Sequence, residues 1–266
     1  MVNIGIRYVN KEKKCEGVIL AGDKGIPSPV GAGDLILECD NFHILGEFPI
    51  VFAPAGYSDD SAVWSNFITN ITVFLYEKFK PNKFSVFEFT RSFNEFYRYV
   101  SDIWSSYYTR EELRQLKHSD NSKFDFDFIL AGSDGKGESF LYYSRIQKHI
   151  SIANVRFMSG YVTSLFGASE GMAFLKEILQ DKEIPERIAV ETAIAILEML
   201  RKIRQDMSPN YQILRLENGE IREMPEELLT KIRGLMDYRW NALWITLKNS
   251  LHKPTYLDFV IKKLGG

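Results

Sequence analysis

The sequence is poor in the residues that build disulfide frameworks and metal sites. It contains two cysteines, Cys15 and Cys39, and four histidines in 266 residues. Two cysteines do not form a disulfide framework, and in a chain of this size they are typical of reduced thiols in a cytosolic protein. The histidines show none of the spacings of zinc ligands. We therefore expect no metal site, and no sequence feature indicates a cofactor.

Long apolar runs and an excess of one charge are also absent. No apolar segment approaches about 20 residues, so no membrane-spanning helix is expected. Charged residues at 11–14 interrupt the first apolar segment before it reaches the length of a signal peptide. The formal net charge of -2 creates no global field that would attract nucleic acid. These features predict a cytoplasmic protein without nucleic-acid or membrane partners.

Hydrophobic and aromatic residues are abundant. They make up 45% and 14% of the chain, which is enough to bury a substantial core in one large domain. The aromatics are densest between residues 84 and 108. A helical core and a subunit interface explain this cluster about equally well, because interfaces are also enriched in aromatics. The abundance of Lys and Glu over Gln is compatible with a thermophilic source.

Apolar periodicity and turn signals predict an ordered series of strands and helices. The expected strands lie at 2–9, 17–22, 35–37, 42–45, 49–55, 124–131 and 140–143, within 155–165, and at 211–216 and 220–222. The expected helices lie at about 61–79, 90–107, 169–179, 185–206 and 225–239. Hairpins are expected at 2–22, at 35–45 and across Asn218-Gly219, which is a strong turn signal. The segment 25–33 is expected to be a loop, because its two prolines and three glycines interrupt a ladder.

Consecutive strands followed by paired helices fit an antiparallel sandwich covered by helical layers. Short phrases in the same order resemble those of proteasome subunits. They are Met1–Ile6, Gly17–Lys24, Ala55–Asp60, Phe128–Asp134, Phe166–Ser169 and Arg204–Ser208. Over about residues 1–235 the chain therefore resembles a divergent member of the proteasome and N-terminal-nucleophile hydrolase family. The resemblance implies an α+β fold, a four-layer α/β/β/α sandwich of two stacked antiparallel sheets flanked by helices. A helical C-terminal extension is expected over 236–266.

The resemblance places the family's catalytic threonine at Met1. A thioether cannot be activated as an acyl-transfer nucleophile in the way that a hydroxyl or thiol can. The supporting aspartate falls on Asp23, which Lys24 follows. The family's lysine, which lowers the pKa of the nucleophile, falls near Asp34 or Leu35, and an aspartate there would have the opposite effect.

Three further positions complete this vestigial site. Gly56 corresponds to the oxyanion-hole glycine. Asp206 and Ser208 correspond to the late loop of the family, one position out of the usual register. Without the nucleophile and the lysine, these groups have no acyl-transfer role.

The sequence leaves three hypotheses about function. The first is a non-catalytic proteasome-like subunit that forms homo-oligomers or assembles with related subunits, or binds peptide or protein partners. The second is a divergent N-terminal-nucleophile amidohydrolase or peptidase activated by processing, for which Gly132-Ser133 is the only Gly-Ser step in a chain with no Gly-Thr or Gly-Cys. That step reads better as part of a hairpin turn, since Asp134-Gly135 follows it. The third is an unrelated α+β module.

Overall fold

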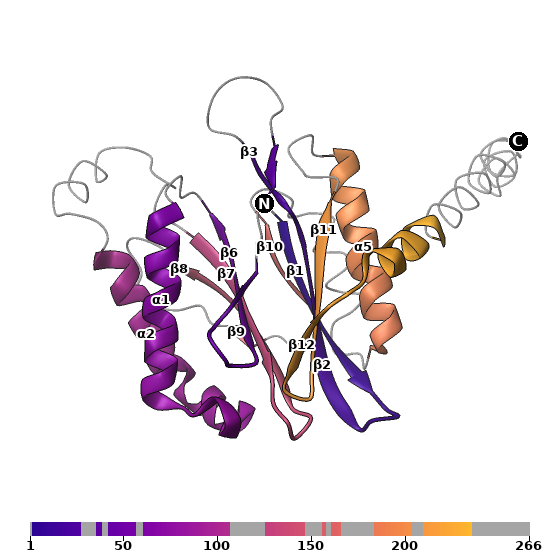
Figure 1. Ribbon diagram of the computed structural model, residues 1–266. Coiled ribbons are helices and arrows are strands. Elements are labelled where there is room, and N and C mark those ends of the chain that lie inside the picture. The colour runs from indigo at the N-terminus through magenta and orange to yellow at the C-terminus, as the bar shows by residue number, and fades with distance from the viewer. Residues whose placement is uncertain are drawn as a thin grey trace, which may run out of the picture. The chain divides into compact units, whose positions relative to one another are not determined.

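The computed structural model describes residues 2–27, 36–38, 42–56, 61–106, 126–146, 156–157, 161–165, 184–203 and 210–235. Two five-stranded antiparallel sheets stack on each other, and helices cover their outer faces (Figure 1). The predicted sandwich is therefore confirmed. None of the helices in the described ranges is long and apolar enough to cross a membrane.

The first sheet contains the amino-terminal hairpin. Its strand order is β10 (Tyr161–Leu165), β1 (Val2–Asn10), β2 (Cys15–Asp23), β11 (Tyr211–Glu217) and β12 (Glu220–Glu223). The predicted Asn218-Gly219 turn joins β11 to β12. Asn218 and Gly219 have φ angles of 53° and 76°. These left-handed values are the ones that a two-residue hairpin turn requires, and Asn and Gly adopt them at low cost.

The second sheet has the order β5 (His43–Ile44), β6 (Ile50–Gly56), β7 (Phe126–Ser133), β8 (Ser139–Ile146) and β9 (Arg156–Phe157). A separate pair joins β3 (Gly25–Pro27) to β4 (Ile36–Glu38). The predicted hairpin between 35–37 and 42–45 is wrong, because β4 pairs with β3 and β5 pairs with β6. The expected loop over 25–33 is also wrong at its start. Pro27 is tolerated there because each strand of a two-stranded sheet is an edge strand.

Helices α1 (Ser61–Lys78) and α2 (Val86–Ser106) cover the second sheet, and α5 (Glu186–Ile203) covers the first (Figure 1). A short 3-10 turn, η1 (Pro81–Lys83), separates α1 from α2. Five aromatics of the predicted cluster are buried in the core under α1 and α2, so this part of the cluster serves packing. They are Phe84, Phe89, Phe93, Phe96 and Tyr97. Phe87, by contrast, is 60% exposed.

The chain divides into two compact units, Met1–Met224 and Pro225–Gly266. The second unit contains a helix over 226–235, within the predicted helix at 225–239. The expected helix at 169–179 and the expected extension over 236–266 lie outside the described residues. The division of the chain at residue 235 stays a prediction.

The two sheets meet across an apolar layer. This layer contains Val18, Leu20, Val51, Ala53, Ile129, Ala131, Leu141, Leu214 and Leu216. Even-numbered residues of β2 and β11 therefore face the second sheet. Gly5 of β1 lies on the same inner face, where an added Cβ would be 2.6 Å from a methyl carbon of Leu141. The close approach of the sheets explains the glycine at this position.

Three hairpin turns from the two sheets meet at one end of the sandwich, which we call the hairpin end. The Glu16 amide donates to the Gly137 carbonyl at 2.8 Å, and the Gly219 amide donates to Ser133 Oγ at 3.1 Å. The Asp134 carboxylate fixes α2 to the same end. It accepts the backbone N–H groups of Val86 at 2.9 Å, Lys136 at 2.9 Å and Glu138 at 3.1 Å. One side chain thus caps a helix and closes the β7–β8 turn.

Candidate functional site

A buried polar row crosses the first sheet at the opposite end of the sandwich, where β1 begins. We call this end the β1-start end. Asn3 of β1 and Gln212 of β11 both pair with Gly22 of β2, so their side chains flank a position that has none. The Asn3 Nδ2 donates to the Pro54 carbonyl of the second sheet at 2.9 Å. This bond shows that the row faces the space between the sheets.

Two carbonyl oxygens of this row have no hydrogen-bond donor among the described residues. They are Asn3 Oδ1 and Gln212 Oε1. Asn3 is fully buried and Gln212 is 8% exposed, so bulk water does not solvate them freely. A buried acceptor without a donor costs about 1–3 kcal/mol. The row can therefore accept two hydrogen bonds.

Asp23 and Lys24, two of the predicted site residues, follow each other at the end of β2. Asp23 is fully buried at the end of β2, and strand alternation directs it to the sheet face opposite that of Gly22, the face that α5 covers. The Lys24 Nζ lies 3.7 Å from Glu223 Oε1 of β12, and its backbone N–H donates to the Asn210 carbonyl at 2.9 Å. The Lys24 ammonium is thus held toward β12.

Gly56 is the last residue of β6 and pairs with Phe126. It lies two residues beyond Pro54, which Asn3 ties to the start of β1, so it belongs to the β1-start end. Met1, Asp206 and Ser208 lie outside the described residues. The structure therefore brings Asp23, Lys24 and Gly56 to one end of the sandwich, and it does not test the complete predicted site.

Sequence analysis missed Asn3 and Gln212. Asn3 carried a usable signal, because asparagine is disfavoured in strands and interrupts an apolar segment here. Gln212 carried no comparable signal, since its neighbour Asn3 becomes apparent only once β1, β2 and β11 are aligned. None of the β1 residues Val2–Asn10 is serine, threonine or cysteine. The described start of β1 thus offers amide chemistry and no nucleophile.

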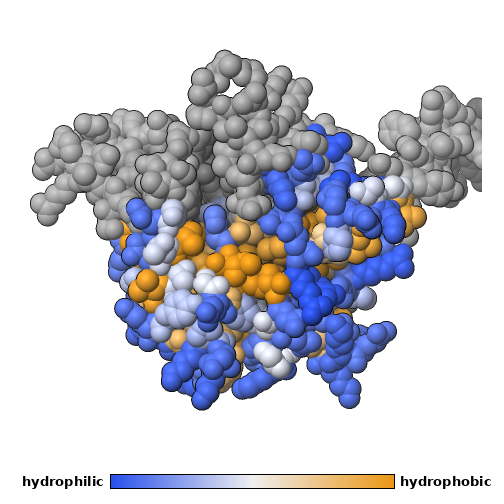
Figure 2. All heavy atoms as spheres, viewed as in Figure 1, coloured by the Kyte–Doolittle hydropathy of each residue, from blue (hydrophilic) through white to orange (hydrophobic). Residues whose placement is uncertain are grey.

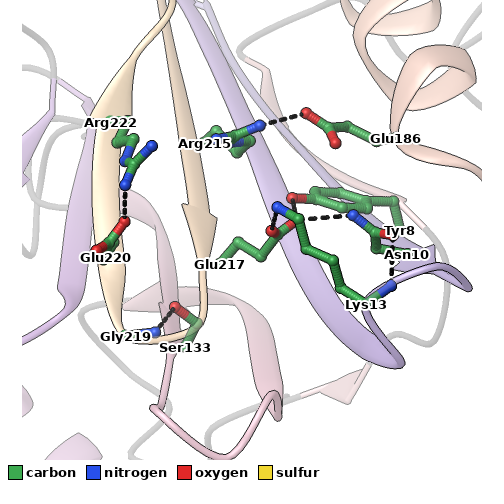
Figure 3. A network of polar contacts seen from close by, with 10 residues as sticks. All are labelled: Tyr8, Asn10, Lys13, Ser133, Glu186, Arg215, Glu217, Gly219, Glu220 and Arg222. Carbon is green, nitrogen blue, oxygen red and sulfur yellow. Dashed lines mark hydrogen bonds and ion pairs between the residues drawn. The ribbon is translucent and has the colours of Figure 1, made fainter.

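A second polar cluster lies at the hairpin end, on the outer face of the first sheet (Figure 3). The Glu217 carboxylate accepts hydrogen bonds from Tyr8 Oη at 2.6 Å, Lys13 Nζ at 2.5 Å and Asn10 Nδ2 at 3.5 Å. Burial alone would raise the pKa of Glu217, but these hydrogen bonds outweigh burial and lower its pKa. Burial, followed by the hydrogen bond to Glu217, raises the pKa of Tyr8. The cluster is thus a charged carboxylate with neutral and cationic donors.

A pocket of about 250 Å³ adjoins this cluster. It is lined by Lys13, Arg215, Glu217, Asn218, Glu220 and Arg222. Each cation in the lining has a carboxylate partner: Lys13 has Glu217, Arg215 has Glu186 at 2.9 Å, and Arg222 has Glu220. The charges of the pocket are therefore matched within the chain. In the described part of the chain, no group of three or more His, Cys, Asp or Glu could hold a metal ion.

Two stacked antiparallel sheets between helical layers, with polar groups gathered where β1 begins, define a proteasome-like fold. Among solved structures, the chain is similar to Anbu (ancestral beta-subunit) from Yersinia bercovieri, with a TM-score of 0.62. The match covers 92% of this chain and 96% of that one, at 14% sequence identity, so the likeness concerns the fold. No protein-family model matches the sequence, and no curated protein matches it either.

Proposed function

We propose that this protein is a proteasome-like subunit without the family's nucleophile, and that it acts through self-assembly or by binding peptide or protein partners. The observation that carries the proposal is the side-chain chemistry at the start of β1. Val2 and Asn3 of β1 supply an alkyl group and an amide, and Met1, which precedes them in the sequence, carries a thioether; none of these groups can attack an acyl group. The Asn3 amide is moreover engaged with the Pro54 carbonyl.

The charges at the β1-start end support the same proposal. An activated hydroxyl needs a nearby cation or base to favour its deprotonated form. The Lys24 ammonium, which could supply this charge, is paired with Glu223. The two carbonyl oxygens of Asn3 and Gln212 are acceptors, and they suit a ligand that offers N–H groups, such as a peptide backbone.

The rival proposal of a processed hydrolase finds less support. Its candidate cleavage step, Gly132-Ser133, forms the end of β7. Ser133 is fully buried, and its Oγ accepts the Gly219 amide. An added Cβ at Gly132 would lie 2.5 Å from the Phe140 ring, so this segment is closely packed. Cleavage there would cut the β7–β8 hairpin in the middle of the second sheet.

Light scattering, intact mass and a hydrolase assay on one purified sample test the proposal. We expect a multimer whose chains have a mass that shows no cleavage between Gly132 and Ser133. We also expect no hydrolysis of fluorogenic peptides and no adduct with a β-lactone that acylates hydroxyl nucleophiles. A Ser133→Ala variant serves as the control for processing and should give the same unprocessed mass and the same lack of hydrolysis. Hydrolysis that disappears on substitution of one hydroxyl or thiol would overturn the non-catalytic role.

A further inference from the structure

Strand β12 is the edge of the first sheet in the described part of the chain. The Asn218-Gly219 turn sets its hydrogen-bonding pattern, because residue pairs alternate between bonded and non-bonded along a hairpin. The pair next to the turn, Glu217 and Glu220, is hydrogen-bonded through its backbone, and so is every second pair after it. The Met224 amide fits this pattern, because it donates to the Ile213 carbonyl. The backbone N–H and C=O of Ile221 therefore point away from β11, toward the side of β12 on which the described residues form no further strand.

The charges on β12 lack an opposite charge across the strand. Arg222 pairs in register with Arg215 of β11, and Glu220 pairs with Glu217. Like charges directly opposite each other are destabilising.

The β11 members of these pairs are compensated within the chain, since Arg215 binds Glu186 and Glu217 binds Lys13. Among the described residues, the β12 members Glu220 and Arg222 form an ion pair only with each other, along the same strand. Their side chains are 59% and 62% exposed. Exposed pairs of this kind contribute little and are easily exchanged.

We propose that a second copy of this chain pairs antiparallel with β12, with the two-fold axis at Ile221. Ile221 would then face Ile221 of the partner subunit and exchange two backbone hydrogen bonds with it. In this register Glu220 faces Arg222 of the partner subunit, and Arg222 faces Glu220 of the partner subunit. The sequence Glu-Ile-Arg is thus complementary to itself when one copy is reversed, as an isologous interface requires.

The surroundings of β12 suit this occupant. Glu220 and Arg222 lie on the outer face of the sheet, whereas Ile221 is half-buried and packs against the apolar layer between the sheets. Pairing would add one isoleucine from each copy to the edge of that layer. In the view of Figure 1, Figure 2 shows apolar surface in the middle of the molecule, bordered by hydrophilic residues. The inference specifies one interface of the assembly proposed above, and it rests on that proposal.

Charge reversal on β12 separates pairing from folding. Glu220→Arg and Arg222→Glu each create two like-charge contacts across the proposed axis. Within one chain, each places an opposite charge beside Glu217 or Arg215 and replaces the exposed Glu220–Arg222 pair by two like charges, so the two effects offset each other and monomer stability should change little. We expect each single variant to raise the dissociation constant by about tenfold, measured by sedimentation. The double variant restores both contacts and should return to within about threefold of the original.

Cysteine cross-linking tests the register. Directly opposed residues in a bonded pair have Cα atoms about 5.5 Å apart, which permits a disulfide. Ile221→Cys should therefore form an intermolecular disulfide under mild oxidation. Glu223→Cys on the same edge should not, because its counterpart lies four residues away along the strand. The unmodified chain, with Cys15 and Cys39, sets the background.

The outcomes distinguish this interface from assembly in general. Loss of association in the single variants, with recovery in the double variant and selective Ile221→Cys cross-linking, supports pairing through β12. A multimer that is indifferent to all these substitutions would overturn the β12 interface alone and leave self-assembly standing. A chain that is monomeric at every concentration would overturn both.

Discussion

Replacing Gly17 with alanine should disrupt the cluster at the hairpin end. An added Cβ at this position would lie 2.3 Å from Tyr8 Cζ and 2.4 Å from Tyr8 Oη. The Tyr8 ring crosses over Gly17 so that its hydroxyl can reach Glu217 on the next strand. Tyr8 is only 1% exposed, so neighbouring residues enclose the ring, and a shift away from Gly17 would carry its hydroxyl away from Glu217. Relief of the clash therefore requires loss of the hydrogen bond to Glu217.

The size of the effect follows from these contacts. Overpacking a filled site costs about 1–3 kcal/mol, and loss of a hydrogen bond to a charged group costs about 1.5–3 kcal/mol. The two costs arise from one displacement of the Tyr8 ring and overlap. Alanine also restricts the unfolded chain more than glycine does, which offsets about 0.5–1 kcal/mol. We expect the free energy of unfolding to fall by about 2–4 kcal/mol.

Urea unfolding followed by circular dichroism measures this change. Gly135→Ala is the matched control, because an added Cβ there has no atom within 4 Å. The control should change stability by less than about 0.5 kcal/mol. In a Tyr8→Ala background the cost of Gly17→Ala should nearly vanish. An equal cost in both backgrounds, within about 0.5 kcal/mol, would refute the reasoning, because contacting residues are expected to couple.

Three further predictions use the same unfolding assay. The lowered pKa of Glu217 stabilises the fold above the unfolded-state value of about 4.3, and this contribution is lost as the pH falls through the folded-state pKa. The free energy of unfolding of the original chain should therefore exceed that of Glu217→Gln by less at pH 3 than at pH 7. A difference that grows as the pH falls would contradict this prediction. Asp134→Ala removes the acceptor of three backbone N–H groups and should cost about 2–4 kcal/mol, with Asp134→Asn costing less; equal losses would argue against the capping role. Asn3→Ala deprives the Pro54 carbonyl of its donor and should cost about 1–3 kcal/mol. A neutral result would show that this bond does not hold the sheets together.

Much of the fold could be predicted because several local signals agree. Apolar residues at helical spacing predicted helices at 61–79 and 185–206, and the structure has α1 at Ser61–Lys78 and α5 at Glu186–Ile203. The Asn218-Gly219 turn was predicted with its two flanking strands because these residues adopt left-handed backbone angles. These signals act over a few residues, so one sequence suffices to find them.

The errors and omissions have a different origin. The predicted hairpin at 35–45 failed because a turn between two apolar segments does not determine which strands pair. The contacts of the hairpin end were missed because Tyr8 and Glu217 are 209 residues apart in the sequence. The polar row at the β1-start end also depends on strand alignment. Long-range register decides all three, and local propensity does not encode it.

The two ends of the sandwich differ in how well their buried polar groups are satisfied. At the hairpin end, Glu217 and Asp134 each accept several hydrogen bonds, and the network holds three turns together. At the β1-start end, carbonyl oxygens of Asn3 and Gln212 have no donor among the described residues. Sequences tend to depart from full satisfaction where a site must bind something. The contrast therefore supports the proposal that a ligand binds at the β1-start end.

The first and last residues of strand β12 contact groups at opposite ends of the sandwich. Its last residue, Glu223, pairs with Lys24 beside the start of β1, and its first residue, Glu220, lines the pocket at the hairpin end. A second copy along this edge would therefore lie close to the Lys24–Glu223 pair. A lower local dielectric strengthens the Coulomb attraction between the two charges, and an ammonium drawn out of the pair would lose both water and its partner, so assembly would favour the paired position of Lys24. Pairing through β12 would then help to keep the Lys24 ammonium away from the start of β1.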